Sequence, residues 1–202
     1  MKQDGILFQP RTALQYQPLT GGTSSQGASF FTSKNPEYGA LFRYFIKDDH
    51  PSDKIKRQER EKGLDEVDIP FPGWDSLDKE MVEASNQAII VIRDSVGKII
   101  DQLTRPLKKG INDANWDLKQ PFGTTVNIDT KNNKINTWRF NVKDGNYTAQ
   151  LFKRIAWQTV KLSEPVSFKV KRIRTSVLSN PLASETEAYT KKLVALRKEL
   201  NI

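Results

Sequence analysis

Carboxylates and one histidine are the side chains of this chain that could carry out chemistry. Paired carboxylates hydrolyse glycosidic bonds when one acts as an acid and the other as a base or nucleophile, but the spacing of the aspartates favours no pair (Asp75, Asp94, Asp101, Asp113 and Asp117). His50, the single histidine, has no cysteine beside it, so it is a weak metal ligand and we interpret it as a solvated loop residue. We therefore predict no catalytic, cofactor-binding or metal-binding residue.

The pair Trp116-Asp117 allows two interpretations. An exposed tryptophan beside a carboxylate is typical of a sugar-binding platform, whereas a tryptophan on the inner face of a strand fills a core. Alternation over GINDANWDL places Asn112, Ala114 and Trp116 on one face of a strand that begins at Gly110. We therefore expect Trp116 to be buried and Asp117 to hold the following turn.

The composition excludes several classes of protein. The chain has 202 residues, no cysteine and a net charge of +8. Its densest charged run, DKIKRQEREK (53–62), alternates in sign, which favours a solvated surface over a nucleic-acid site. No apolar run approaches the roughly 20 residues that cross a bilayer, so we predict no membrane span. The N-terminus lacks the apolar region of a signal peptide, which leaves either a cytoplasmic protein or a fragment whose export signal lies elsewhere.

Short strands separated by turns dominate the middle of the chain. The clearest pair is a hairpin of QAIIVIR (87–93) and KIIDQL (98–103), joined by an Asp-Ser-Val-Gly turn. Further strands are predicted by alternating apolar residues. They cover residues 39–47, 110–118, 140–143, 146–155 and 166–170.

The remaining segments are expected to lie around these strands. Residues 48–66 are predicted to be an exposed excursion with a short helix that Ser52 caps and Gly63 ends, and residues 68–80 to be an extended segment packed by Phe71 and Trp74. The C-terminus begins with the capping box Ser184–Glu187, and Tyr189, Leu193, Leu196 and Leu200 then recur at helical spacing.

Seven segments occur in an order that resembles a known family. They are FFTSKNPEYGALFRYFIKDD, KIKRQEREK, DIPFPGWDSL, the hairpin, NWDLKQP, DGNYTAQL and LSEPVSFKV, and they cover roughly Phe30 to Lys171. The hairpin and NWDL resemble the immunoglobulin-like, fibronectin III-like module of the flagellar hook-capping protein. The whole order resembles the C-terminal region of bacterial sortilin-type β-propeller proteins with BNR repeats, often labelled glycosyl hydrolases. This chain lacks the propeller, on which hydrolase chemistry would be expected, and the proline that precedes the Gly145-Asn146-Tyr147 strand entry in the family.

The predicted architecture is mainly β, an antiparallel immunoglobulin-like β-sandwich. Residues 1–36 are expected to form an extended lead, residues 37–172 the sandwich, and residues 173–202 a linker with an amphipathic helix. The resemblance implies a periplasmic, cell-surface or secreted location.

Three functions follow from these observations. The first is a non-catalytic accessory module that packs on a β-propeller or an envelope protein assembly. Its expected contacts are the apolar residues at the two ends: Phe8, Phe30, Phe31, Leu193, Leu196 and Leu200. The alternative is a carbohydrate-binding module with Trp74, Trp138 or Trp157 as an exposed platform. The third, a Bacteroidetes-type secretion-signal domain, is disfavoured because the chain ends in a helix.

Overall fold

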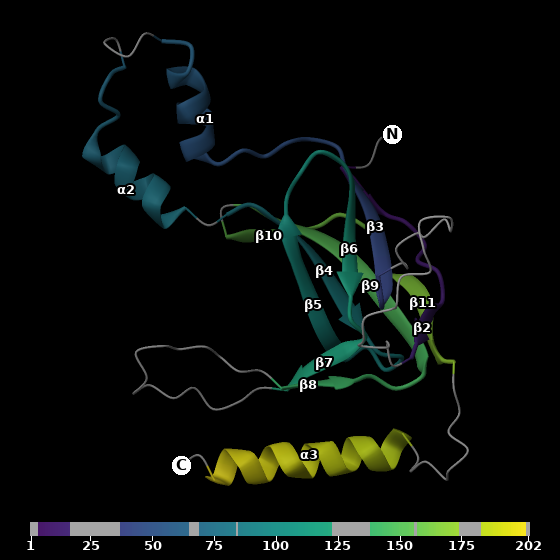
Figure 1. Cartoon of the computed structure of the whole chain (residues 1–202). Coiled ribbons are helices and arrows are strands. Elements are labelled where there is room, and N and C mark those ends of the chain that lie inside the picture. The colour runs from purple at the N-terminus through teal and green to yellow at the C-terminus, as the bar shows by residue number, and fades with distance from the viewer. Residues whose placement is uncertain are drawn as a thin grey trace, which may run out of the picture.

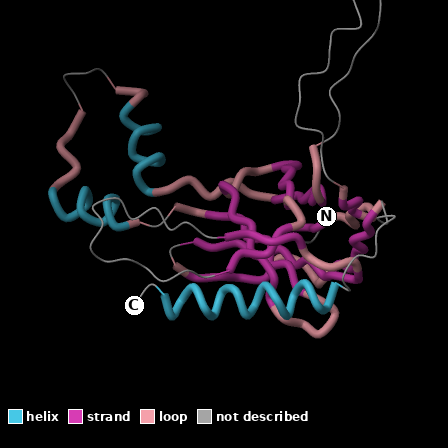
Figure 2. The backbone as a smooth tube through the Cα atoms, turned by 60° about the horizontal axis from the view of Figure 1, so that its bottom comes forward, coloured by secondary structure: helices cyan, strands magenta, loops and turns pink. Residues whose placement is uncertain are grey.

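The protein is mainly β, with antiparallel and mixed sheets and three helices among its described residues (Figure 1). The structure is a computed structural model, and it describes residues 4–16, 37–64, 69–83, 85–122, 138–155, 157–173 and 183–200. Two sheets enclose one core, and a pair of short helices projects from them as a separate arm (Figure 2).

The predicted hairpin is confirmed and lies at one edge of the larger sheet. It consists of β4 (Gln87–Arg93) and β5 (Ile99–Pro106). The Asp94 carboxylate closes the turn by accepting hydrogen bonds from the backbone N–H groups of Val96 (3.0 Å) and Lys98 (2.9 Å). Gly97 has a φ of 84°, a conformation that favours glycine.

The larger sheet has six strands, with β9 (Gly145–Ile155) at its centre. One edge of β9 pairs with β4. Along its other edge, residues 145–149 pair with β11 (Val166–Arg172) and residues 152–155 pair with β10 (Gln158–Lys161). Tyr147, Ala149 and Leu151 of β9 are buried, as their alternation predicts. The strand β2 (Ala13–Gln15) pairs in parallel with β11 and makes this sheet mixed.

The smaller sheet has the order β1 (Gly5–Leu7), β3 (Ala40–Ile46) and β6 (Gly110–Trp116). Its inner residues meet those of the larger sheet in an aromatic cluster. The Trp116 ring lies 5.8 Å from that of Tyr147 and 6.1 Å from that of Phe168, and Phe168 lies 5.2 Å from Phe42. The largest fully buried side chains are Trp116, Tyr44, Phe42, Ile46, Ile90, Ile92, Leu118, Leu151 and Val170.

The N-terminal segment differs from the expected lead. Residues 5–7 pair with β3 and residues 13–15 pair with β11, so this segment contributes a strand to each sheet. Leu7 and Ala13 are buried in the core. These strands have no signal in the sequence because each has only three residues, too few to show a period. Residues 17–36, with Phe30 and Phe31, lie outside the described residues.

The arm contains one expected helix and one that was not expected. Helix α1 (Asp53–Glu61) begins where Ser52 was predicted to cap it, and the Ser52 hydroxyl accepts a hydrogen bond from the Ile55 N–H. The prediction of an extended segment at residues 68–80 is wrong for residues 74–80, because α2 (Trp74–Val82) begins at Trp74. Pro70, Pro72 and Gly73 all precede the helix and therefore do not interrupt it.

Two further elements complete the described chain. The short hairpin of β7 (Lys119–Phe122) and β8 (Trp138–Asn141) follows β6, and α3 (Ala183–Leu200) is the predicted C-terminal helix. Thr190 of α3 is buried, and a cavity of about 630 Å³ between α3 and the strand ends is lined by residues such as Tyr147, Arg172 and Thr190.

Candidate binding surface

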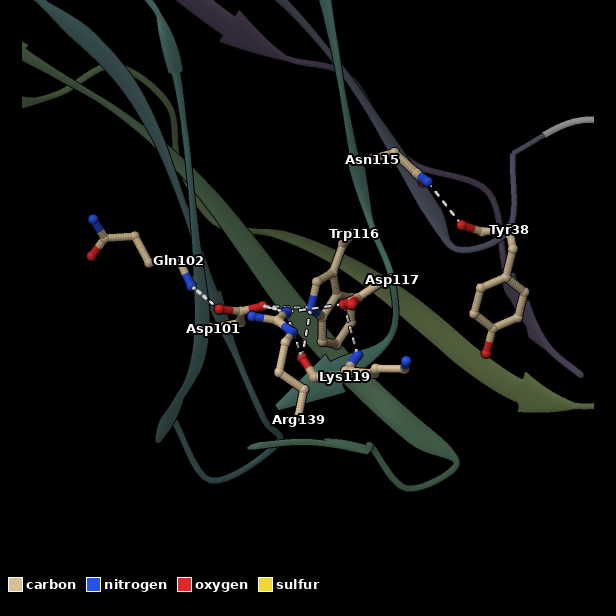
Figure 3. Close-up of polar contacts among 8 residues, drawn as sticks. All are labelled: Tyr38, Asp101, Gln102, Asn115, Trp116, Asp117, Lys119 and Arg139. Carbon is tan, nitrogen blue, oxygen red and sulfur yellow. Dashed lines mark hydrogen bonds and ion pairs between the residues drawn. The ribbon is translucent and has the colours of Figure 1, made fainter. Parts of the chain in front are cut away.

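The Trp116-Asp117 pair belongs to a partly buried polar cluster that links four strands (Figure 3). The Trp116 indole is fully buried, which confirms its predicted place in the core. Its Nε1–H donates to Asp101 Oδ2 of β5 (3.0 Å) and to the Lys119 carbonyl of β7 (3.1 Å). Asp117 accepts a hydrogen bond from the Lys119 N–H (3.2 Å), so it does hold the turn.

Arg139 of β8 completes this cluster. Its Nη2 donates to Asp101 Oδ2 (2.7 Å) and to Asp117 Oδ1 (3.0 Å). Asp101 is only 7% exposed, and its other oxygen accepts a hydrogen bond from the Gln102 N–H. A buried carboxylate that is paired and hydrogen-bonded in this way is typical of a structural site. Asp101 and Asp117 both accept hydrogen bonds from Arg139, so the two carboxylates link β8 to β5 and to the end of β6.

The arm is held together by ionic hydrogen bonds around Arg57. Arg57 of α1 donates from Nε and Nη2 to both oxygens of Glu80 in α2 (2.7 and 2.8 Å), and its Nη1 contacts Glu61 (2.8 Å). The hydrogen bonds from Arg57 lower the pKa of the Glu80 carboxyl. Neither helix has a buried residue, so apolar burial contributes little to this pairing.

The base of the arm is fixed by contacts between its two ends. The Glu83 carboxylate, just beyond α2, accepts a hydrogen bond from the Asp53 N–H at the start of α1 (2.9 Å). Asn86 Nδ2 donates to the His50 carbonyl (2.7 Å). These contacts bring the ends together and orient the arm relative to β4. His50 thus lies in a loop, as predicted.

The surface of α2 that points away from α1 carries three large apolar side chains. Glu80 faces α1, so the helical period of 3.6 residues directs Trp74, Met81 and Val82 to the opposite side. These three side chains are 73%, 79% and 70% exposed. We call them the α2 stripe. Monomeric proteins expose single apolar residues routinely, but a group of large apolar side chains marks an interaction site.

A cleft lies between the two helices of the arm. Its volume is about 590 Å³, and its apolar lining comes from Leu64, Pro70, Phe71 and Pro72. Arg60 and Lys79 also line it. Within the part of the chain that the structure describes, neither of these two cations has a carboxylate within 4 Å. We call this feature the arm cleft.

Trp157 is a second exposed aromatic residue at the same end of the larger sheet. Arg154 of β9 pairs with Gln87, the first residue of β4, and the arm precedes β4 in the chain, so the β9–β10 turn and the arm lie at one end. Trp157 is 69% exposed and has a φ of 70°, a left-handed conformation that is unusual for a bulky residue. Residue spacing gives no signal for such a conformation, so the sequence predicts an exposed ring at Trp157 but not the strained backbone.

The other predicted contacts are spread over the molecule. Phe8 is exposed beside β1, Leu196 of α3 is exposed and Leu193 is half-buried. Trp138 and Leu200 lie in β8 and α3, but their side chains are outside the described residues, as are Phe30 and Phe31. Of the predicted end contacts, the structure thus places Phe8 next to β1 and Leu193 and Leu196 on α3. It gathers Trp74 and Trp157 at the arm end.

Comparisons with protein-family models, with curated proteins and with solved structures find no match for this chain. Among the described residues, no three or more His, Cys, Asp or Glu side chains are grouped so that they could hold a metal ion. None of the described helices has both the length and the hydropathy to cross a bilayer.

Proposed function

We propose that the chain is a non-catalytic accessory module of the immunoglobulin-like β-sandwich type that packs on a protein partner. The observation that carries this proposal is the strained and exposed Trp157. Left-handed backbone costs a residue with a Cβ about 1–2 kcal/mol, and such strain persists where the surroundings or a function require the residue.

Leu118 shows what offsets such strain when its origin is structural. It is the other described non-glycine residue with a positive φ (56°), and its side chain is fully buried in the core. Burial of a leucine contributes about 1.5–3 kcal/mol, which outweighs the backbone cost. Trp157 has no comparable burial in this chain. A partner that buries its ring would supply the missing contribution.

The arm supports the same conclusion. The α2 stripe places the aliphatic side chains of Met81 and Val82 beside the exposed Trp74. Such a mixture of aromatic and aliphatic side chains suits a protein interface. The resemblance to the C-terminal region of sortilin-type proteins points to a β-propeller domain or an envelope assembly as this partner. It also points to a periplasmic, cell-surface or secreted location.

Carbohydrate binding is the second candidate, because Trp74 and Trp157 are both exposed. A sugar platform requires flat, accessible ring faces. Trp74 instead packs edge-to-face against Phe71, with ring centres 5.2 Å apart and planes at 67°. The geometry therefore favours the protein partner.

The test replaces Trp157 with glycine and measures stability and binding separately. Glycine tolerates the left-handed backbone, so Trp157→Gly is expected to raise the free energy of unfolding by up to about 1 kcal/mol in urea titrations. Binding to a purified sortilin-type β-propeller, measured by biolayer interferometry, is expected to weaken at least about 30-fold, as for an interface tryptophan.

Leu118→Gly is the matched control, because it relieves the same kind of strain but removes a buried side chain and must lower stability. A Trp157→Gly variant that is less stable than the wild type, or that binds the propeller equally well, would contradict the proposal. Gel retardation by soluble polysaccharides that Trp74→Ala abolishes would favour carbohydrate binding instead.

A further inference from the structure

The α2 stripe has a charge pattern of its own. Asp75 and Asp78 are exposed and lie on the same side of α2 as the stripe, because Asp78 is four positions after Trp74 and Asp75 is seven positions before Val82. No ion pair within the described residues neutralises either carboxylate. The solvent-facing side of α2 is thus apolar and acidic, although the chain as a whole carries a net charge of +8.

The arm cleft has the complementary character. Its apolar lining (Leu64, Pro70, Phe71 and Pro72) faces a space of about 590 Å³, and Arg60 and Lys79 add positive charge. Arg57 pairs with both Glu61 and Glu80, so this group keeps one negative charge, and Lys56 pairs with Asp53 at 2.8 Å. Arg60 and Lys79 outweigh the excess carboxylate, so the described residues that line the cleft carry four positive and three negative charges, a net charge of +1.

We propose that these two surfaces bind each other between two copies of the chain. The α2 stripe of one copy docks into the arm cleft of the second, with Asp75 and Asp78 against Arg60 and Lys79. The occupant is a second copy because the same arm presents both an acidic apolar ridge and a basic apolar cleft. A pair of copies related by a two-fold axis can satisfy both surfaces at once.

The size of the arm limits the strength of this association. Two nine-residue helices offer less than the roughly 800 Å² per partner of a standard interface. The dimer is accordingly weak and depends on concentration. Its consequence is a module with two Trp157 surfaces, which would bind a multivalent partner more tightly than either copy alone.

This inference uses the α2 stripe that also supports the proposed function, so in the dimer Trp157 alone remains for the partner protein, and the dimer is measured without that partner. The propeller titration can fail while self-association holds, and the reverse is equally possible. Trp157→Gly leaves both arm surfaces intact and is therefore expected to dimerise like the wild type.

The experiment is sedimentation velocity on the full chain between about 10 µM and about 1 mM, the range of weak complexes. The wild type is expected to shift from monomer to dimer across this range. The variants Asp75→Lys/Asp78→Lys and Arg60→Glu/Lys79→Glu each place like charges opposite one another. Each is expected to weaken the dimer about tenfold or more, with helical circular dichroism unchanged.

Mixing the two variants is the decisive step. The basic stripe of the first variant then meets the acidic cleft of the second, and the acidic stripe of the second meets the basic cleft of the first, so a heterodimer is expected to form. Lys169→Glu/Lys171→Glu, on the exposed side of β11, makes the same charge change as Arg60→Glu/Lys79→Glu and is expected to leave the dimer intact. A wild type that stays monomeric throughout, or a mixture that does not associate, would overturn the proposal.

Discussion

At the scale of single residues, Asp101 and Arg139 determine how Trp116 contributes to the fold. The indole ring fills the space between the sheets, while its N–H meets a carboxylate that Arg139 also holds. The ring is therefore an apolar packing element and the N–H is a polar anchor for β5 and β7. These two contributions can be separated by substitution.

Trp116→Ala is expected to lower the free energy of unfolding by about 3–5 kcal/mol, because it leaves a large cavity in the core. Trp116→Phe keeps most of the ring but removes the donor, so it is expected to cost about 1 kcal/mol for the lost hydrogen bond and somewhat more for the smaller ring. Urea unfolding of both variants measures the difference. An alanine variant with an unchanged melting temperature would show that the ring is not part of the core.

At the scale of elements, the arm and the strands depend on different forces. The strands bury apolar side chains on the core face, whereas no residue of α1 or α2 is buried. The arm therefore takes its local shape from a cap, from the Arg57 contacts and from the Glu83 contact at its base. We expect the arm to be dispensable for folding and sensitive to acid.

Replacement of residues 53–83 by a short Gly/Ser linker tests the first expectation. The arm ends are joined at its base by the His50–Asn86 hydrogen bond, so a short linker can close the gap. The free energy of unfolding is expected to change by roughly 1 kcal/mol, the scale of loop-closure entropy. Chemical denaturation of this deletion variant is the measurement, and a chain that no longer folds would mean that the arm supports the core.

Acid is expected to loosen α1 from α2. The hydrogen bonds from Arg57 hold the pKa of Glu80 below its usual value of 4.5. A carboxyl group whose pKa is lowered by folding stabilises the folded contact at pH values above its unfolded pKa. This stabilisation is lost as the pH falls through the folded-state pKa and the carboxylate is protonated. Amide NMR shifts of α1 and α2 should therefore change below about pH 4.5, while those of β4 and β9 stay constant. In the Arg57→Gln variant, the amide shifts of α1 and α2 should already at pH 7 resemble those of the wild type in acid. Wild-type amide shifts in α1 and α2 that stay constant down to pH 3 would contradict this account.

At the scale of the whole molecule, the N-terminal segment adds an edge strand to each of the two sheets. The strand β1 is antiparallel to β3 and β2 is parallel to β11, so residues 5–15 cross from one sheet to the other. Gln15 is buried as well, and its side-chain amide donates to the Val142 carbonyl (3.1 Å). We therefore expect this segment to be ordered in the isolated chain.

Leu7→Ala is expected to cost about 2–4 kcal/mol, because Leu7 is buried in the core. Hydrogen exchange on the wild-type monomer is expected to show protected amides in β1 and β2. Rapid exchange of both strands, together with a Leu7→Ala variant of wild-type stability, would mean that the segment is a mobile lead.

Much of the fold could be predicted from the sequence, because local patterns carry the necessary information. Alternating apolar residues identified β4, β5, β6, β9 and β11 and their buried faces, since a strand directs successive side chains to opposite sides. The Asp94–Gly97 turn and the Ser52 cap each depend on side chains within four residues of the groups that they bind. Local chemistry therefore determined the elements and placed Trp116 in the core.

Only the tertiary structure decided how these elements meet. Alternation identifies the inner face of a strand but not its neighbour, so the sheet order, the parallel pairing of β2 and the contact of Arg139 with Asp101 had no signal in the chain. The same holds for the arm. The Arg57–Glu80 contact spans 23 positions, and it decides which side of α2 faces α1 and which side, with Trp74, Met81 and Val82, faces solvent. Such contacts depend on where the chain brings distant segments together, which no local pattern encodes.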